Sequence, residues 1–269
     1  MGARILLVGC GKMGGAMLGG WLAGDVAAAD VTVIEPFAGE EVAKLYGVTV
    51  AKSVDEVAGD FLPDIVIFAV KPQNMDDILP LYRDFVRPGT VFLSIAAGRT
   101  VASFEKFLGE EAAIVRTMPN TPAAIGRGIT VAFANAPVTD AQRMLAQSLL
   151  EAVGEFDWVD DEALIDAVTA VSGSGPAYVF LLIEAMAAAG EKAGLPADLS
   201  MRLARATVAG AGELARLSEE AASQLRVNVT SPGGTTAAAL EVLMADDGVQ
   251  PVFDRAIAAA TARSKELAG

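Results

Sequence analysis

The stretch ILLVGCGKMGGAML, residues 5–18, decides the fold of the first half of this 269-residue chain. An apolar run of strand length leads into Gly9, Gly11 and Gly14, and a helical pattern follows at once. In this G-x-G-x-x-G spacing the first glycine permits a tight turn, the second lets the backbone approach a pyrophosphate, and the third allows helix and strand to pack closely. The stretch predicts a strand, a loop and a helix whose N-terminus binds a dinucleotide.

Short apolar runs alternate with helical patterns as far as about residue 160. The expected strands are 4–9, 31–35, 64–70, 90–95 and 113–118, followed by two more at 128–134 and 155–159. The expected helices between them are 12–24, 38–46, 75–86, 101–108 and 139–153. Nearly continuous apolar strands are covered by helices on both faces, and strand–helix alternation implies parallel pairing with right-handed crossovers. We predict an α/β doubly wound (Rossmann) sheet as a dinucleotide-binding domain over residues 1–160.

After residue 160 the strand pattern ends and Ala- and Gly-rich helical patterns take over. The expected helices are 162–171, 176–193, 198–216, 219–227, 235–245 and 249–267. Small residues on helix faces, such as Gly190, Gly210 and Gly212, allow a second helix to approach closely, although each costs about 1 kcal/mol relative to alanine. We therefore predict an all-α domain over residues 161–269 that binds substrate and pairs subunits; a monomeric helical cap is the alternative.

Composition narrows the possible classes of function. The net charge of −14 argues against a nucleic-acid partner, which would need clustered Lys and Arg. Cys10 is the single cysteine, so no intramolecular disulfide can form and a cytoplasmic location is the default. The absence of histidine excludes Ser-His-Asp and Cys-His catalysis and argues against a structural zinc site, so no metal is expected.

No membrane partner is expected from the sequence. The N-terminus shows no basic segment followed by an apolar run and a cleavage site. The most apolar later stretch, residues 177–189, carries Glu184 and is too short to cross a bilayer.

An acidic residue, Glu35, ends the second expected strand. A carboxylate at this position accepts hydrogen bonds from both ribose hydroxyls of NAD and repels the 2′-phosphate of NADP. The site is therefore expected to use NADH well; a solvated loop carboxylate is the alternative.

Three further loops follow strand ends, AVKP (69–72), SIAAG (94–98) and RTMPNTPAAIG (116–126). Ligands of such sheets bind outside the carboxyl ends of the strands, so these loops should border the cofactor. The small side chains of the second loop would let a flat nicotinamide lie close. The cofactor residues expected beyond the three loop glycines and Glu35 are Cys10, Lys12, Met13, Ser53, Ala69, Val70, Lys71, Pro72, Ala96, Ala97, Asn120 and Asn228.

A second anion site is suggested by NVTSPGGTT, residues 228–236, which leads into a helical pattern. Hydroxyls and glycines at the start of a helix are typical of a small anion held by backbone N–H groups. A plain N-capping turn is the alternative.

Taken in order, GCGKMGGAM, AVKPQ, SIAAG, MPNTP, DAVTAVSGSGPAY and NVTSPGGTT extend over essentially the whole chain. Together they resemble the Δ1-pyrroline-5-carboxylate reductase family, and SGSGPAY (172–178) and VTSPGGTT (229–236) are the most specific pieces. The resemblance implies reduction of a cyclic imine that carries a carboxylate, by hydride from NADPH or NADH, to give L-proline. It also implies a helical second domain that interleaves with a partner in a homodimer, possibly within a decamer.

The resemblance also assigns roles to residues. Ser231 and the backbone of Gly234, Thr235 and Thr236 would hold the substrate carboxylate, and Thr236 would face the ring nitrogen as the catalytic residue. Glu162 and Glu219 match positions that border the substrate, and Asn228 matches one that borders the active site. An imine nitrogen can arrive already protonated, so a hydroxyl or water can replace the missing histidine.

The chain departs from the family pattern at two places. Glu35 stands where small hydroxyl or basic residues often favour NADPH, and Ser53 stands in place of a frequent asparagine, so both put the 2′-phosphate contact in doubt.

Two other functions compete with the reductase. A hydroxyacid dehydrogenase would need a Lys or His acid, and residues 107–191 contain no lysine. A non-catalytic NAD-sensing module would have no use for a second anion site.

Overall fold

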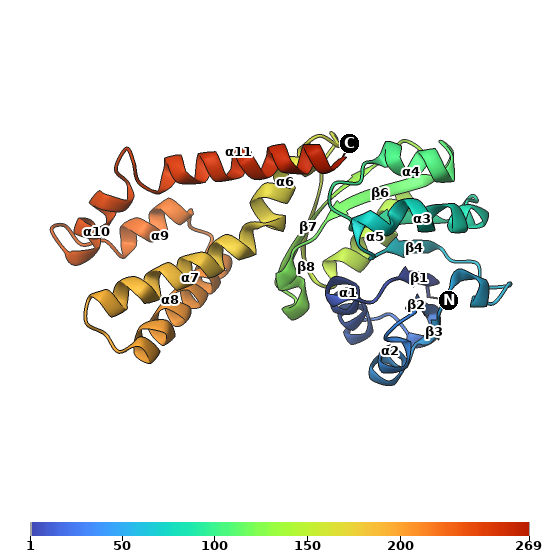
Figure 1. Cartoon of the computed structure of the whole chain (residues 1–269), viewed down its shortest axis with the longest axis horizontal. Helices are drawn as coiled ribbons and strands as arrows, with labels where there is room; N and C mark the ends of the chain where they lie inside the picture. Colours follow the sequence, from blue (N-terminus) through green and yellow to red (C-terminus); the bar gives the residue numbers. More distant parts are fainter. Residues whose placement is uncertain (1, 269) are drawn as a thin grey trace. The chain divides into compact units, whose positions relative to one another are not determined.

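The structure, a computed structural model, describes residues 2–268 (Figure 1). By packing, the chain forms two units. The first contains the residues up to Gly173 together with those from Ala260 onward, and the second is Ser174–Ala259. This division falls later than the predicted boundary between residues 160 and 161, so the predicted domain bounds stay a prediction. The outer bounds of the two predicted domains, residues 1 and 269, lie outside the described residues.

The first unit contains an eight-stranded sheet in the order β3-β2-β1-β4-β5-β6-β7-β8. Its strands are β1 (Ile5–Val8), β2 (Val31–Ile34), β3 (Thr49–Ala51), β4 (Ile65–Phe68), β5 (Val91–Ser94), β6 (Ala113–Met118), β7 (Gly128–Ala134) and β8 (Gly154–Trp158). The strand order reverses direction at β1, which confirms the doubly wound class. The edge strand β3 was not predicted, because its three residues are too few to give a pattern.

One pair breaks the expected parallel pairing, since β7 runs antiparallel to β6. The connection between them contains a 3-10 turn, Thr121–Ile125, instead of a crossover helix. A parallel connection needs a dozen or more residues, so this short loop can only reverse the chain. The other neighbouring strands are parallel, including β7 and β8, which are joined through the helix α5 (Asp140–Glu151).

Helices cover both faces of the sheet (Figure 1). The helices of this unit are α1 (Lys12–Ala23), α2 (Gly39–Tyr46), α3 (Met75–Ile78), α4 (Val101–Leu108), α5 and α6 (Leu164–Val168), with the end of α11 (Val249–Ala268). Because side chains alternate along a strand, Ile5 and Leu7 pack with α1 and α5, whereas Leu6 and Val8 pack with α3 and α4. The expected helix 75–86 divides into α3 and a 3-10 segment, Leu79–Phe85.

The second unit is helical, as predicted. It contains α7 (Gly175–Lys192), α8 (Ala197–Leu217), α9 (Ala222–Asn228), α10 (Thr235–Leu243) and the first part of α11. Within this chain its helices bury few side chains, and many large apolar residues on α7 and elsewhere are exposed: Val179, Phe180, Leu181, Leu182, Leu214, Leu217, Val242, Leu243, Val252 and Phe253. A unit with so much exposed apolar surface requires a cover from outside the chain.

One continuous helical stretch, Leu164–Lys192, is long and apolar enough to cross a bilayer by length and composition alone. It is longer than residues 177–189, the stretch that the sequence predicts to be too short, because α6 and a π-helical turn, Thr169–Gly173, extend α7 toward its N-terminus. Only 11% of the apolar window is buried in the chain, so its apolar side chains are mostly exposed.

The two long helices α7 and α8 meet at a notch over Gly190. A methyl group at this position would lie 2.1 Å from the Ser200 Oγ atom. The buried Ser200 hydroxyl donates a hydrogen bond of 2.7 Å to the carbonyl of Ala187. The glycine thus admits a polar side chain that joins the two helices, which agrees with the close helix approach predicted from its sequence.

We predict that Gly190→Ala destabilises the protein by about 1–3 kcal/mol, because the added methyl group overpacks the notch. Ser200→Ala should cost about 1 kcal/mol through the lost hydrogen bond. In the double variant the methyl group meets no hydroxyl, so its destabilisation should be about 1 kcal/mol less than the sum of the two. Thermal unfolding of the four proteins measures this coupling, and simple additivity would contradict it.

Candidate dinucleotide and anion sites

The glycine loop has the geometry that each of its glycines was predicted to allow. Gly9 adopts a φ of +90°, and a methyl group there would lie 2.9 Å from the Ala69 carbonyl oxygen. A methyl group on Gly14 would lie 2.5 Å from the Gly9 carbonyl oxygen, so α1 packs on β1 only without a side chain. A methyl group on Gly11, by contrast, would meet nothing within 4 Å. The space above Gly11 is open to a ligand.

The N-terminus of α1 fits the pyrophosphate of a dinucleotide. Gly11 is the N-cap residue, no side chain caps the helix, and its first turn contains no acidic residue. The positive end of the helix dipole and the N–H groups of the first turn therefore face no acidic side chain of α1 itself. The Glu35 carboxylate lies just before the N-cap, on the N–H of Cys10. A cavity of about 850 Å³ begins at this loop and follows α1 as far as Gly24.

Glu35 follows β2 and its carboxylate reaches the glycine loop. One oxygen accepts a hydrogen bond of 3.0 Å from the Cys10 N–H, and the other accepts from the N–H groups of Phe37 at 3.1 Å and Ala38 at 3.4 Å. Sequence reasoning predicted this position but not these contacts. A second cavity, of about 590 Å³, is lined by Glu35, the residues that follow it and Lys52.

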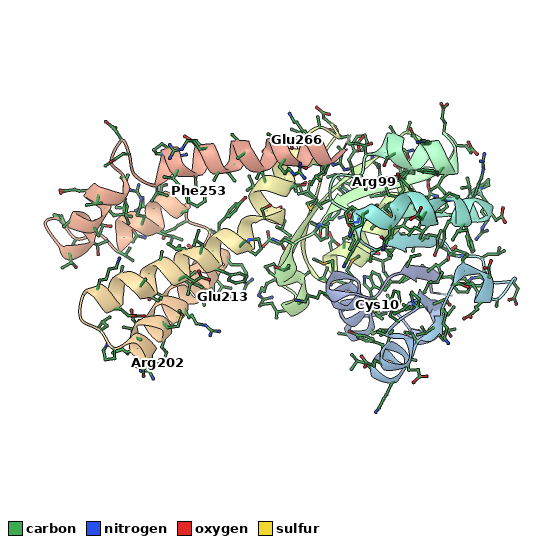
Figure 2. The ribbon with its side chains drawn as sticks, viewed as in Figure 1. Cys10, Arg99, Arg202, Glu213, Phe253 and Glu266 are labelled. Atoms are coloured by element: carbon green, nitrogen blue, oxygen red, sulfur yellow. The ribbon has the colours of Figure 1, made fainter. Side chains whose placement is uncertain are left out.

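Cys10 is half-buried between Gly9 and Gly11, beside α1 (Figure 2). Burial raises the pKa of its thiol to about 11, and the charge of Glu35 adds to the rise. The thiol therefore stays protonated at neutral pH and is a poor nucleophile. This agrees with a small side chain that fills space.

The other predicted cofactor residues of the first unit gather at one edge of the sheet. The parallel strands β1 to β6 end there, because parallel strands place their carboxyl ends at a shared edge. The residues that follow these strands are Gly9, Cys10, Gly11, Lys12, Met13 and Gly14 after β1, Glu35 after β2, Ser53 after β3, Ala69, Val70, Lys71 and Pro72 after β4, Ala96 and Ala97 after β5, and Asn120 after β6.

Two of these loops are held by hydrogen bonds at the sheet. The Ala96 N–H donates to the Ser94 Oγ atom at 3.2 Å, and the Asn120 Oδ1 atom accepts from the Ile129 N–H at 3.0 Å. Arg99, in the loop after β5, forms an ion pair with Asp76 of α3. Rigid loops at the edge of the sheet are suited to hold a flat ring in one place.

The second predicted site, the anion site of residues 228–236, lies in the helical unit, at the start of α10. Gly233 adopts a φ of +67°, and the N–H of Gly234 donates to the Ser231 carbonyl at 3.0 Å. Gly234 is the N-cap residue, no side chain caps α10, and its first turn, which begins with Thr235 and Thr236, contains no acidic residue. The absence of a side-chain cap disfavours the plain capping turn and leaves the helix N-terminus able to bind an anion.

Asn228 and Glu219 also belong to the helical unit, in or near α9. The Asn228 amide donates to Glu220 at 2.9 Å and accepts from Gln224 at 2.8 Å, and Glu219 is exposed. Neither residue gathers with others into a metal site: among residues 2–268 no three His, Cys, Asp or Glu side chains lie together in this way.

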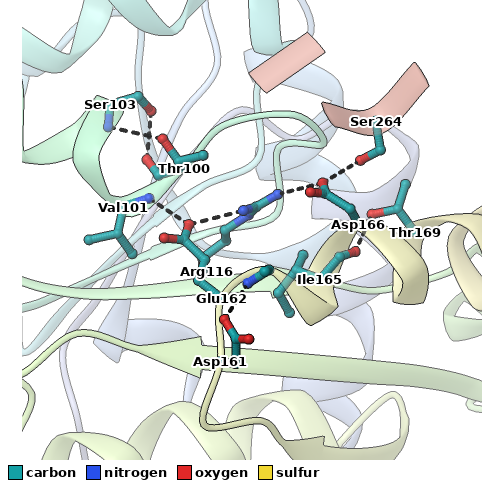
Figure 3. Close-up of polar contacts among 11 residues, drawn as sticks. Thr100, Val101, Ser103, Arg116, Asp161, Glu162, Ile165, Asp166, Thr169 and Ser264 are labelled. Atoms are coloured by element: carbon teal, nitrogen blue, oxygen red, sulfur yellow. Dashed lines mark hydrogen bonds and ion pairs between the residues drawn. The ribbon is translucent and has the colours of Figure 1, made fainter. Parts of the chain in front are cut away.

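Glu162 lies in the first unit, in a cluster that was not predicted (Figure 3). One Glu162 oxygen accepts hydrogen bonds from Arg116 at 2.9 Å and from the Val101 N–H at 2.8 Å. Arg116 also reaches Asp166 at 3.5 Å, and the Ser264 hydroxyl donates to the same Asp166 oxygen at 2.7 Å. We call Arg116, Glu162, Asp166 and Ser264 the Arg116 cluster. The substrate contact expected of Glu162 stays a prediction.

A signal for the Arg116 cluster was present in the sequence. Arg116 interrupts the strand AIVRTM, all of whose residues are buried, and is 2% exposed. A buried guanidinium needs partners, so an acidic residue elsewhere had to reach it. The sequence could not say which one, because Glu162 and Asp166 are distant from Arg116 along the chain.

Comparisons with known proteins agree on one family. Residues 162–267 match the model of pyrroline-5-carboxylate reductase dimerisation, and residues 4–98 match that of the coenzyme F420-dependent NADP oxidoreductases. A pyrroline-5-carboxylate reductase of Pseudomonas aeruginosa is 44% identical over 98% of this chain and 97% of its own length.

Solved structures give the same result. A pyrroline-5-carboxylate reductase from Coxiella burnetii superposes with a TM-score of 0.93 at 35% identity, over 99% of each chain. That of Plasmodium falciparum, solved with NADP bound, superposes with a TM-score of 0.83 at 29% identity, over 99% of this chain and 98% of its own.

We predict that substitutions at two glycines of this loop affect cofactor binding and protein stability separately. Gly11→Asp introduces a favoured N-cap residue into open space, so the melting temperature should not fall. Its charge should weaken the binding of NADH and NADPH about tenfold or more, because it faces the site of the pyrophosphate. Gly14→Ala should lower the melting temperature, because its methyl group meets the Gly9 carbonyl. Calorimetric titration and thermal unfolding measure both effects; unchanged cofactor affinity in Gly11→Asp would exclude this loop as the site.

Proposed function

Because the chain belongs to the pyrroline-5-carboxylate reductase family, we propose that it reduces 1-pyrroline-5-carboxylate to L-proline, the last step of proline biosynthesis. The observation that carries this function is a likeness to reductases over nearly the full length of the chain. NADPH or NADH supplies the hydride when bound at the edge of the sheet. The residues at that edge and the helical unit then bind and orient the two reactants.

The start of α10 is the proposed site for the substrate carboxylate. Its support is a helix N-terminus with no acidic residue in the first turn and no side-chain cap. Ser231 and the backbone of Gly234, Thr235 and Thr236 would hold the carboxylate, as the family resemblance implies. The Gly234 N–H already donates to the Ser231 carbonyl, so Thr235 and Thr236 would supply the N–H groups of the first turn. Thr236 would then donate a hydrogen bond toward the ring nitrogen, and Glu219 and Asn228 would border the site.

The proposal is tested by absorbance. The purified protein should oxidise NADPH or NADH in the presence of pyrroline-5-carboxylate, with L-proline as the product. A panel of 2-keto and 3-keto acids tests the hydroxyacid dehydrogenase alternative. Turnover of a keto acid but not of the imine would overturn the proposed function, and cofactor binding without any turnover would favour a sensing module.

We propose that the chain forms a homodimer through the helical unit. The dimerisation match covers residues 162–267, which include most of the exposed apolar side chains of α7 to α11. A partner subunit would cover this surface, so the apolar stretch Leu164–Lys192 needs no membrane. The family resemblance implies a decamer as the larger assembly. With a net charge of −14, we propose that no nucleic acid is a partner, and from the single cysteine we propose a cytoplasmic location.

We predict that Glu35 favours NADH over NADPH. Its carboxylate already takes three backbone N–H groups around the glycine loop, so these donors are not free to hold a 2′-phosphate. Like charges should further reduce kcat/KM for NADPH about tenfold. Glu35→Ser should narrow the difference.

Glu35→Gln is the matched control, because it keeps the length and an acceptor oxygen but removes the charge. If repulsion dominates, Glu35→Gln and Glu35→Ser should gain similar activity with NADPH. A strong preference of the wild-type protein for NADPH would show that Glu35 does not bind the ribose.

We predict that Thr236→Val lowers kcat by about tenfold to a thousandfold, the range for losing a positioned donor. Valine keeps the volume and removes the hydroxyl, and Thr236→Ser is the control that keeps the hydroxyl. The affinity for the cofactor should hardly change in either variant, because the dinucleotide loop is on the other unit. A wild-type kcat in Thr236→Val would mean that the proton comes with the substrate or from water.

A further inference from the structure

The Arg116 cluster joins several elements of the first unit at one buried point (Figure 3). Its guanidinium comes from β6, and Glu162 and Asp166 come from the start of α6 and the residues before it. Two carboxylates face one guanidinium, and each receives one further donor, the Val101 N–H or the Ser264 hydroxyl. The two carboxylates carry one negative charge more than the guanidinium balances. The two neutral donors therefore help to stabilise that charge.

The donor that Glu162 receives has a special place. Val101 is the first residue of α4, and its N–H has no partner within the helix. It also ends the loop of residues 95–100 after β5. Glu162 therefore fixes the point at which this loop enters α4. At the other end of the loop, the Thr117 hydroxyl donates to the Ser94 carbonyl at 2.9 Å.

The middle of the same loop lies against the end of α11. A methyl group on Gly98 would lie 2.8 Å from the Leu267 Cβ atom, and Gly98 has a φ of +71°. Ser264, one turn earlier on α11, is the residue that bonds Asp166. The last turns of the chain thus contact both the loop and the carboxylate that anchors Arg116.

We propose that the Arg116 cluster is a positioning device for the loop of residues 95–100, with Glu162 as a positioning residue and not a substrate ligand. This inference rests on the proposed function, which places that loop beside the nicotinamide. Glu162 holds the loop end directly, and Ser264 acts through Asp166 and Arg116. A loop displaced by even a fraction of an ångström would bind and orient the cofactor less well.

The test compares Glu162→Gln and Ser264→Ala with Glu266→Gln, an exposed residue of α11 that pairs only with Arg263 among the contacts described. Glu162→Gln keeps the shape but weakens the charged contacts to Arg116 and Val101. Both cluster variants should weaken NADH and NADPH binding about tenfold, measured by cofactor fluorescence without substrate. The KM for pyrroline-5-carboxylate should not change, and Glu266→Gln should behave as wild type.

Two outcomes would overturn the positioning role. An increased KM for pyrroline-5-carboxylate with unchanged cofactor affinity in Glu162→Gln would make Glu162 a substrate ligand. A lower melting temperature with unchanged cofactor affinity in both variants would make the cluster merely structural. Cofactor affinity is measured without turnover, so a wild-type protein that fails to reduce the imine would reject the proposed function and leave this test intact.

Discussion

Contact between α1 and β1 is the constraint on which the sheet unit depends. Gly14 brings the helix backbone so close to the Gly9 carbonyl that no side chain fits between them. This contact points the N-terminus of α1 at the edge where the parallel strands end. The same packing buries Trp21, whose indole N–H donates to the Leu149 carbonyl on α5 at 2.7 Å. The close contact at Gly14 thus fixes both the packing of the core around Trp21 and the edge of the sheet toward which the N-terminus of α1 points.

The helical unit follows a different logic. Its helices meet through small residues, as at Gly190, while Gly210 and Gly212 face open space in the single chain. Large apolar side chains such as Phe180 and Leu182 are also exposed. These exposed side chains lie within residues 162–267, which match the family's dimerisation model. If the proposed dimer covers them, the stability of this unit should depend on protein concentration.

The sequence was informative where a residue type by itself restricts the local geometry. The glycines of the first loop and the apolar strands predicted the doubly wound sheet and the edge at which the predicted cofactor residues gather. It was uninformative where the outcome depended on distant partners. The direction of β7 depended on a short loop, and the partners of Arg116 lie at positions 162 and 166. The role of Glu35 at the ribose stays a prediction, and its bonds to the N–H groups of Cys10, Phe37 and Ala38 could be seen only in the folded chain.

The return of the chain end to the sheet unit has a consequence for synthesis. Arg116 lies buried within β6, yet its carboxylates and the Ser264 hydroxyl follow much later. An arginine buried without its partners is strongly destabilising, by about 3–5 kcal/mol. Domains generally fold from the N-terminus while the ribosome is still adding residues. Glu162 and Asp166 emerge before the helical unit and can pair with Arg116 early, whereas the Ser264 bond to Asp166 and the contact of Leu267 with Gly98 form only after the last helix has emerged. The first unit therefore gains its last contacts only when the helical unit that lies between them in the chain has also been made.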